Sequence, residues 1–422
     1  MPGPRTEDLL APSLAIDWPN MPIVRAEGSR VYDPQGRAYL DFVSGMAALP
    51  LGHNHPAVVE AIRRQAGELI HGPLGVYQYE VLLDLARDLR EVLPGEIGSF
   101  FFGNSGAEAV EGALKLARYV TGRPMVVAFR GGFHGRTLGA LALTASKAKY
   151  RHGYHQLPGV VHSRFPNPLR EGLADAESAA RALEELDDVL AHVAAPEDVA
   201  AFLVEPIQGE GGYLPAPPAF LAGLRERADR AGSLLVFDEV QTGFGRTGSM
   251  FAAQHYGVVP DVMAVAKAIA SGLPLGAVAA SPSLMGRWSA GSHGTTFGGN
   301  PVAAAAARAT LRVLREEDLP GRAARLGALA TERLREVQRR HAVVRDVRGP
   351  GLMIGVEFGE GRPEDGLFVE RVLQEALALG LVLYPCGVHS SVLRFIPPLN
   401  VAEEDLLAGI DILDKAVARA GA

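Results

Sequence analysis

The sequence contains a single cysteine, Cys386, among its 422 residues. One cysteine excludes an intramolecular disulfide and any metal site made of several cysteines, and it fits a reducing compartment. The chain also lacks an excess of basic residues, because 41 Lys and Arg against 48 Asp and Glu give a formal net charge of −7. No overall positive field is present to attract nucleic acid or an anionic membrane, and we expect neither as a partner.

Long apolar runs and targeting signals are also scarce. The uncharged run at residues 268–286 nearly reaches membrane-spanning length, but prolines, glycines and serines interrupt it. We therefore interpret it as a buried strand with loops. Residues 1–8 have neither the basic start nor the apolar stretch of a secretory signal. These features predict a cytoplasmic protein.

What remains is the composition of a folded globular chain. Hydrophobic residues make up 48% and charged residues 21% of the sequence, and the length suggests two or three domains. Short apolar runs alternate with stretches of helical period, which predicts an α/β fold with a largely parallel, helix-covered sheet. Because ligands in such folds bind at the carboxyl ends of strands, we expect chemistry in the loops that follow these runs. The strand candidates are residues 99–103, 125–129, 200–204, 234–237 and 262–265.

The last third of the sequence has a different pattern. A helical region rich in alanine and arginine runs from Pro301 to about Arg340, with a break near residues 319–321. Strand patterns return at residues 352–358 and 393–396, and a final helix is predicted at 402–418. We infer a separate C-terminal α/β domain, joined to the rest by the long helical region. An acidic, alanine-rich stretch at 171–195 predicts a surface helix.

Two candidate catalytic residues follow strand patterns. Asp238 ends the run at 234–237 and begins a glycine-rich loop, where its carboxylate either faces a ligand or caps a turn. Lys267 interrupts a run of apolar and small residues, so it either extends to the edge of the protein or is a working amine with a lowered pKa. A desolvated lysine is the group that forms a Schiff base with an aldehyde such as that of pyridoxal phosphate (PLP).

Small residues at two places suit the binding of an anion. Ser105, Gly106 and Ala107 lie at a predicted junction between a strand and a helix, where backbone N–H groups and the helix dipole favour a phosphate. The alternative is an ordinary helix cap by Asn104 or Ser105. Thr296 offers a hydroxyl and an N–H group on a second glycine-rich loop.

Aromatic, basic and acidic side chains occupy three further segments. The loop at residues 131–137 carries Phe133, His134 and Arg136. Phe133 suits stacking on a ring or core packing, and Arg136 suits a carboxylate clamp or a surface ion pair. Two glutamates, Glu205 and Glu210, follow the strand at 200–204, where one could balance an arginine and the other anchor a loop. No histidine lies at metal-ligand spacing near them, so we expect no metal. Arg394 lies among apolar residues, where a guanidinium needs an anionic partner, either a substrate carboxylate or an internal salt bridge.

In this order the motifs resemble the class III PLP-dependent aminotransferases, a fold type I group that includes 4-aminobutyrate and ornithine aminotransferases. The resemblance extends from residues 28–33 and 52–56 to Arg394. It implies a large domain with a mainly parallel sheet covered by helices, and a smaller α/β domain made of N- and C-terminal segments. The implied ranges are 1–60 for the N-terminal segment of the small domain, 61–309 for the PLP-binding domain and 310–422 for the rest of the small domain. A homodimer, or a tetramer built from dimers, is implied as well.

The resemblance also implies roles for single residues. Lys267 would form the internal aldimine with PLP and then carry protons between the substrate and the cofactor. Asp238 would pair with the pyridine nitrogen and keep it protonated. Thr296 would reach the phosphate of the neighbouring subunit's cofactor. The other cofactor-binding residues implied are Ser105, Gly106, Ala107, Phe133, His134, Glu205 and Gln241.

Substrate specificity is implied by two arginines. Arg136 matches the arginine that binds the donor's remote carboxylate, and Arg394 the one that holds the α-carboxylate of 2-oxoglutarate. Glu210 matches the glutamate that masks this second arginine, and Met46 occupies a wall position often held by isoleucine. The implied activity is transfer of the terminal amine of a 4-aminobutyrate-like donor to 2-oxoglutarate.

Several alternatives stay open at this point. Gly106-Ala107 stands where the 4-aminobutyrate enzymes commonly have Gly-Ser, and the shared motifs also suit ornithine, acetylornithine or lysine as donor. An amino-acid racemase of the same family would use the same lysine and cofactor. A non-catalytic cofactor-binding or regulatory domain of this fold is an alternative of a different class.

Overall fold

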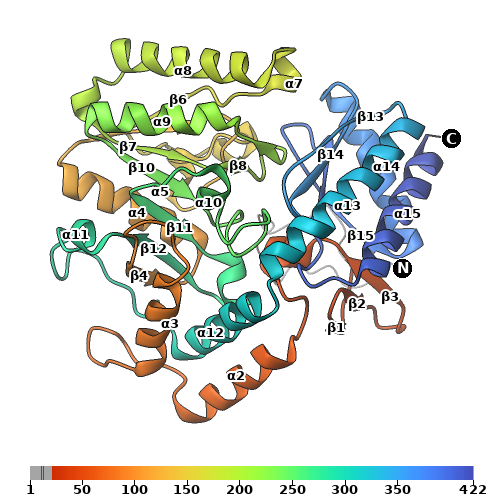
Figure 1. The fold of residues 1–422 in the computed structure, drawn as a ribbon, viewed down its shortest axis with the longest axis horizontal. Helices are drawn as coiled ribbons and strands as arrows, with labels where there is room; N and C mark the ends of the chain where they lie inside the picture. Colours follow the sequence, from red (N-terminus) through yellow and green to blue (C-terminus); the bar gives the residue numbers. More distant parts are fainter. Residues whose placement is uncertain (1–10, 12, 14–20, 422) are drawn as a thin grey trace.

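The computed structural model describes residues 11, 13 and 21–421. The expectation of no secretory signal rests on residues 1–8, and these lie outside the described residues. A seven-stranded sheet forms the centre of the larger part of the molecule (Figure 1). Its strands, in spatial order, are β4 (Ser99–Gly103), β12 (Gly276–Ala280), β11 (Val262–Val265), β10 (Leu234–Asp238), β7 (Val199–Val204), β5 (Met125–Phe129) and β6 (Val160–Ser163).

The sheet is mainly parallel, as the sequence predicts. β6, β5, β7, β10 and β11 run parallel to one another, while β12 is antiparallel to both β11 and β4. β12 is fully buried and lies inside the uncharged run at 268–286, so the interpretation of that run as a buried strand with loops is confirmed. Short helical turns flank it, at η4 (Lys267–Ala270) and α11 (Pro282–Met285).

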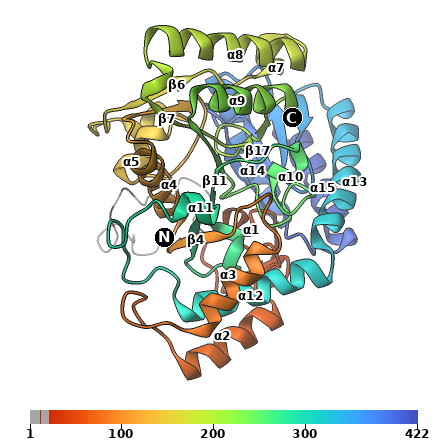
Figure 2. The same cartoon turned by 60° about the vertical axis from the view of Figure 1, so that its left-hand side comes forward.

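Helices cover both faces of this sheet because both faces are apolar. Alternate residues of each strand point to opposite sides, so in β5 Val127 and Phe129 pack in one cluster while Val126 and Ala128 pack in another. The first cluster meets α8 (Asp175–His192) and α9 (Pro218–Ala231), and the second meets α4 (Gly106–Thr121) (Figures 1 and 2). The result is a three-layer arrangement, and α8 confirms the helix predicted at 171–195.

The smaller part combines both ends of the described chain. The C-terminal strand β15 (Leu381–Val382) runs parallel to β3 (Ala38–Asp41), which continues to β2 (Arg30–Tyr32) and β1 (Arg25–Glu27). A second sheet has the order β13 (Val344–Arg348), β14 (Ile354–Phe358), β17 (Val392–Phe395) and β16 (Tyr384–Cys386). Helices α14 (Pro363–Leu379) and α15 (Glu403–Ala420) pack beside these sheets (Figure 1). The predicted smaller domain of N- and C-terminal segments is therefore confirmed.

Two long helices, α12 (Pro301–Glu316) and α13 (Leu319–Arg340), connect the two parts. The predicted break falls two residues earlier than expected, at 317–318, where Asp318 has a φ of 44° and its carboxylate accepts from the Gly321 N–H at 3.2 Å. The proline at 320 belongs to the first turn of α13, where its missing N–H is tolerated. The expected interruption at residues 319–321 is thus the start of a helix.

The remaining elements are short or lie at the periphery. They are α1 (Ser44–Ala47), α2 (Pro56–Glu68), α3 (Glu80–Arg90), α5 (Leu138–Leu143), α6 (Ala148–Arg151), α7 (Pro168–Glu171), α10 (Ala252–Tyr256), η3 (Pro196–Asp198), β8 (Ile207–Gln208) and β9 (Leu214–Pro215). Within the described residues, none of the helices has both the length and the apolar character needed to cross a bilayer.

The two predicted domain boundaries, residues 60 and 309, fall inside the helices α2 and α12. The domain ranges stay a prediction.

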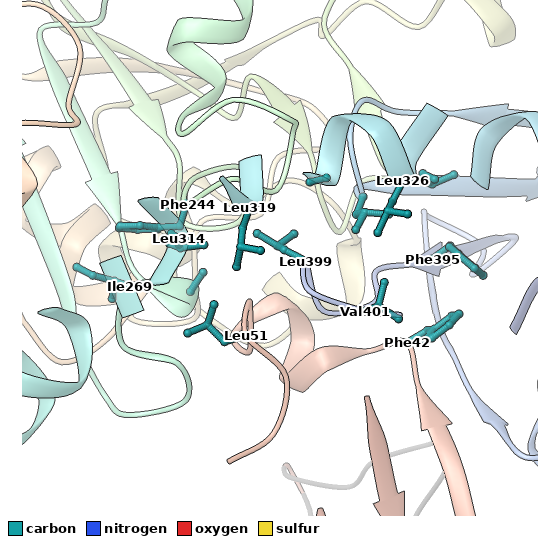
Figure 3. Packing of buried hydrophobic residues seen from close by; sticks show 14 of the residues in the cluster. Phe42, Leu51, Phe244, Ile269, Leu314, Leu319, Leu326, Phe395, Leu399 and Val401 are labelled. Carbon is teal, nitrogen blue, oxygen red and sulfur yellow. The ribbon is translucent and has the colours of Figure 1, made fainter. Parts of the chain in front are cut away.

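One large apolar cluster joins the two parts (Figure 3). It runs from Ile269 in η4, through Leu319 at the start of α13 and Leu399, to Phe395 at the end of β17. These four side chains are 1% exposed or less. The segment that carries Lys267 and the strand that carries Arg394 are therefore packed against a common core.

Candidate active site

The residues singled out by sequence gather at one edge of the large sheet. Asp238 is the last residue of β10, and Lys267 follows the neighbouring strand β11, whose Ala264 lies opposite Asp238. Glu205 follows β7, and His134 lies on the loop after β5. Because these strands are parallel neighbours, their carboxyl ends lie side by side, where ligands bind in such sheets.

Asp238 is bonded to a buried imidazole. Its Oδ2 lies 2.8 Å from His134 Nδ1, and its Oδ1 accepts from the Val240 N–H at 3.1 Å. Burial acts to lower the pKa of His134, but the bond to Asp238 and the charge of that carboxylate outweigh burial and raise it. Asp238 therefore closes a turn, which is one of the two alternatives, and a histidine fixes its carboxylate; that it faces a ligand stays a prediction.

Glu205 connects the loops around this carboxylate. Its two oxygens accept from the backbone N–H groups of Phe133, at 2.8 Å, and of Gly209, at 2.9 Å. Burial, with a smaller contribution from Asp238, raises the pKa of Glu205 to about 7 against the opposing effect of His134. Glu205 thus holds the Phe133 loop in place, which matches the anchoring role considered for one of the two glutamates.

Lys267 occupies an unusual position for a basic side chain. It is only partly exposed, and its φ of 46° lies in the left-handed region. Burial lowers its pKa; Asp238 acts to raise it, and Arg394 adds to the lowering. An amine with a lowered pKa is less often protonated and is a better nucleophile than an ordinary lysine.

The start of α4 lies close to the same edge. Ser105 caps the helix, since its hydroxyl accepts from the Glu108 N–H at 3.2 Å. A Cβ added at Gly106 would lie 2.8 Å from Val240 Cγ1, and one added at Gly135 would lie 2.8 Å from Ala107 Cβ. The first turn of α4 is therefore closely packed against the Asp238 loop and the Phe133 loop, with the positive end of the helix dipole at this point.

Arg394 and Glu210 form a buried ion pair. Arg394, on β17, is 3% exposed, and its guanidinium contacts Oε2 of Glu210 on the loop after β8. Burial acts to raise the pKa of Glu210, but Arg394 and Lys147 outweigh it and hold the pKa below its ordinary value. The salt bridge considered for Arg394 is present, with the predicted glutamate as its partner.

Two residues that sequence reasoning missed complete this group. Lys147 Nζ lies 2.9 Å from Glu210 Oε1, and the Tyr150 hydroxyl donates to the same oxygen at 2.9 Å. Lys147 ends an uncharged run at residues 137–146, which is the kind of signal that singled out Lys267. No pattern could have indicated Tyr150, because its partner lies 60 residues away in the chain.

Tyr150 also contacts two residues of the Phe133 loop. The guanidinium carbon of Arg136 lies 4.3 Å from the centroid of the Tyr150 ring, a cation–π distance. The Phe133 ring meets Tyr150 edge-on, with centroids 5.8 Å apart. Arg136 is exposed, so its charge is open to a ligand, and Phe133 is half-buried.

Three further predicted residues lie in different surroundings. Gln241 is buried after β10 and accepts from the Tyr213 hydroxyl. Met46 is half-buried in α1, where residues 44–47 all have positive φ and Asp41 accepts from the N–H groups at the start of the turn. Thr296 is exposed on the loop before α12, and the described chain itself does not enclose it.

The chemistry of this donor set fits PLP. An amine of lowered pKa suits the aldehyde, a carboxylate fixed by His134 suits a protonated pyridine nitrogen, and the amides at the start of α4 suit the phosphate. Within the described residues, no three His, Cys, Asp or Glu side chains gather in a way that could hold a metal ion.

A fold of this kind is shared with known transaminases. A crystal structure of an amine transaminase from an uncultivated Pseudomonas species, in its PLP-bound form, matches the chain with a TM-score of 0.89 and 31% identity, covering 96% of each chain. The likeness defines the class of the protein as a fold type I, PLP-dependent transaminase.

Sequence comparisons identify the family. The family described as Aminotransferase class-III matches residues 15–417. The 5-aminovalerate aminotransferase DavT of Pseudomonas aeruginosa is 39% identical over 394 residues, 92% of this chain and 91% of that protein. The 4-aminobutyrate aminotransferase GabT of Escherichia coli is 38% identical over 396 residues, 93% and 92% of the two chains. The chain belongs to the class III aminotransferase family and is a PLP-dependent enzyme, as the motifs implied.

Proposed function

We propose that this enzyme transfers the terminal amine of a 4-aminobutyrate-like ω-amino acid to 2-oxoglutarate. The observation that carries the proposal is the buried ion pair of Glu210 and Arg394 beside the open guanidinium of Arg136. One arginine is available to a donor that has a single remote carboxylate. The other is neutralised until an acceptor with a second carboxylate takes the place of the glutamate.

The proposed exchange explains how one site could accept two kinds of substrate. With a mono-carboxylate amine, Glu210 stays on Arg394, and Arg136 binds the only carboxylate. With 2-oxoglutarate, the α-carboxylate takes Arg394 and the remote carboxylate takes Arg136. Both states keep the buried guanidinium paired, which its burial requires.

The cofactor roles belong to the same proposal. When bound, PLP supplies an aldehyde that takes up the donor's amine and a ring that withdraws electrons from the carbon that loses a proton. Lys267 would hold the aldehyde and, once free, move a proton between the substrate carbon and C4′ of the cofactor. Asp238, fixed by His134, would hold a proton on the pyridine nitrogen. Glu205 would keep Phe133 in place against the ring, and Met46 would form part of the substrate wall.

The phosphate and the 3-oxygen of the cofactor would be bound by other residues. Gly106 and Ala107 would donate backbone N–H groups to the phosphate beside Ser105, and Gln241 would approach the 3-oxygen. Thr296 would reach the phosphate of the partner subunit's cofactor from its exposed loop.

A homodimer is part of the proposal because Thr296 would act across the interface. Four large apolar side chains on two segments near Thr296 are 60% to 70% exposed: Ile70, Val76, Tyr77 and Phe297. The segments are linked, since the Asn300 side chain donates to the Ile70 carbonyl at 2.9 Å. Exposed apolar side chains gathered in this way support a surface covered by a second copy of the chain.

The identity of the donor is the part of the proposal with the closest alternatives. The names of the two relatives favour 4-aminobutyrate and 5-aminovalerate, which differ by one methylene. Ornithine, acetylornithine and lysine, and a racemase reaction, use the same core groups. One methylene in a pocket changes rates only about 10- to 200-fold, so the donors must be compared directly.

The deciding experiment is a panel of donors at fixed 2-oxoglutarate, read as glutamate released, with chiral analysis of each remaining amino acid. We expect the highest kcat/KM with 4-aminobutyrate or 5-aminovalerate. Release of glutamate only from ornithine or lysine would replace the proposed donor class. Loss of optical purity without glutamate release would indicate a racemase.

A further inference from the structure

Two side chains of the active site have no role in the function proposed above. Lys147 directly precedes α6, Tyr150 lies within it, and both contact Oε1 of Glu210 at 2.9 Å. Arg394 contacts the other oxygen, Oε2. If Glu210 leaves Arg394, the contacts of its Oε1 can therefore persist.

We propose that Lys147 is a specificity-determining positioning residue, which acts as the counter-ion of Glu210 whenever a substrate carboxylate occupies Arg394. The inference rests on the proposed use of Arg394 by the acceptor. Lys147 acts through Glu210 and does not touch the substrate.

The burial of this group makes its charge balance strict. The side chains of Lys147, Glu210 and Arg394 are only 9%, 13% and 4% exposed. A charge that loses its partner at such burial is strongly unfavourable. Without Lys147, an acceptor carboxylate on Arg394 would leave Glu210 unpaired beside a second anion. With Lys147, two cations face two carboxylates, and every charge has a partner.

The requirement for Lys147 differs between the two substrates. While a mono-carboxylate amine is bound, Glu210 still has Arg394 as its partner, so a second cation is not essential. When a dicarboxylate is bound, Lys147 is the ammonium group that remains on Glu210. Loss of Lys147 therefore weakens dicarboxylates selectively, which a general structural role would not do.

Tyr150 supports this arrangement from the same segment. Burial and the neighbouring Glu210 raise the pKa of its phenol, so the hydroxyl stays protonated and donates to the carboxylate. The ring of the same residue contacts Arg136, whose guanidinium carbon lies 4.3 Å from the ring centroid. One short segment thus connects Glu210 with the arginine proposed for the donor's carboxylate.

The test measures equilibrium binding of two unreactive five-carbon acids to the PLP-loaded enzyme, glutarate with two carboxylates and valerate with one. In Lys147→Met we expect the Kd of glutarate to rise about tenfold and that of valerate to change less than about twofold. Lys147→Arg should restore glutarate binding. Lys415→Met removes the same charge at an exposed position of α15 and is the matched control.

The same Lys147→Met substitution in a Glu210→Gln variant shows whether Lys147 acts through Glu210. In Glu210→Gln the neutral amide needs no counter-ion, so adding Lys147→Met should change the Kd of glutarate less than about twofold. A persistent tenfold loss in that background would mean that Lys147 binds the substrate directly and would overturn the inference. Equal losses for glutarate and valerate in Lys147→Met would also overturn it.

These measurements separate the inference from the proposed function. If the wild type binds glutarate but forms no glutamate from any donor, the proposed function is rejected and the role of Lys147 is still decided by the binding data. If glutamate forms but Lys147→Met binds glutarate normally, the role of Lys147 alone is rejected. A wild type that does not bind glutarate would overturn both.

Discussion

Lys267 combines a strained backbone with the side chain on which the proposed chemistry depends. A φ of 46° is uncommon for a residue other than glycine and costs of the order of 1 to 3 kcal/mol. The residue that follows two positions later, Ile269, is fully packed in the apolar cluster between the two parts. The packing of η4 therefore compensates for a conformation that the lysine would not hold alone.

Substitution of the buried ion pair is expected to change the choice of acceptor. Arg394→Ala should lower kcat/KM for 2-oxoglutarate by about 10²-fold, because Glu210 loses a partner and the α-carboxylate loses its site. Glu210→Ala should lower the KM for 2-oxoglutarate, because no internal ion pair has to be broken, and should weaken selection for the amine donor. Steady-state constants with 2-oxoglutarate and pyruvate measure both effects. Unchanged preference between these acceptors in both variants would count against the exchange.

At the scale of elements, α13 approaches a loop of the small part so closely that only glycine fits. A Cβ added at Gly327 would lie 2.0 Å from the carbonyl oxygen of Gly351. We expect Gly327→Ala to lower the free energy of unfolding by about 1 to 3 kcal/mol, because the helix and the loop must move apart. Gly67→Ala in α2 is the matched control, since nothing lies within 4 Å of its added Cβ. Urea unfolding should show this control equal to the wild type or up to about 1 kcal/mol more stable.

The loop after β10 is held by a second buried carboxylate, Glu239. It accepts from the N–H groups of Ala252 and Ala253 at the start of α10, at 2.9 and 2.7 Å, and burial raises its pKa to about 7. Between about pH 4.3, where an unfolded glutamate ionises, and pH 7, the folded state holds a proton that the unfolded state has lost. The contribution of Glu239 to stability therefore falls as the pH rises through this window.

Glu239→Gln should flatten this part of the pH dependence. The expected difference in the free energy of unfolding across the window is at most roughly 4 kcal/mol. The pH dependence that comes from Glu205, whose pKa is also raised to about 7, stays in this variant. Unfolding curves from pH 4.5 to 8 measure the slope. Glu226→Gln, at an exposed position of α9, should leave the slope as in the wild type. An identical slope in Glu239→Gln would contradict the assignment.

The elements that the sequence predicts well are those buried on both faces. Residues 125–129 and 262–265 form uninterrupted apolar runs, and the structure has strands with these same bounds. β12 was hidden within a longer apolar run, and β8, β9 and β15 have only two residues each, too few for any period to be recognised. Partners distant in sequence could not be predicted either, because the bonds of Glu210 to Lys147 and Tyr150 depend on how α6 packs against the loop after β8.

At the scale of the whole molecule, the two parts share buried polar contacts as well as apolar ones. Arg246 on the loop after β10 donates to the carbonyls of Leu352 and Pro397 at 3.1 and 2.7 Å, and burial lowers its pKa to about 10. The large and small parts are thus joined by a guanidinium that reaches backbone carbonyls just before β14 and just after β17.

Subunit mixing tests whether two chains build one site. A Lys267→Ala chain and a Thr296→Ala chain each lack one proposed group, and a mixed dimer would contain one site with both groups intact. At limiting PLP, a random 1:1 mixture should recover about one quarter of the wild-type activity. If Thr296 served its own subunit, the mixture would show only the mean of the two homodimers.

The apolar cluster between the parts has a consequence for the fit of the acceptor. Ile269 lies two residues after Lys267, Phe395 directly follows Arg394, and both pack in this cluster (Figure 3). The filling of the cluster therefore fixes the span between the lysine of the large part and the arginine of the small part. Under the proposed roles, this span must match the distance between the carbonyl carbon of a 2-oxo acid and its α-carboxylate. Leucines and phenylalanines that no substrate ever meets would thus set how well every acceptor fits.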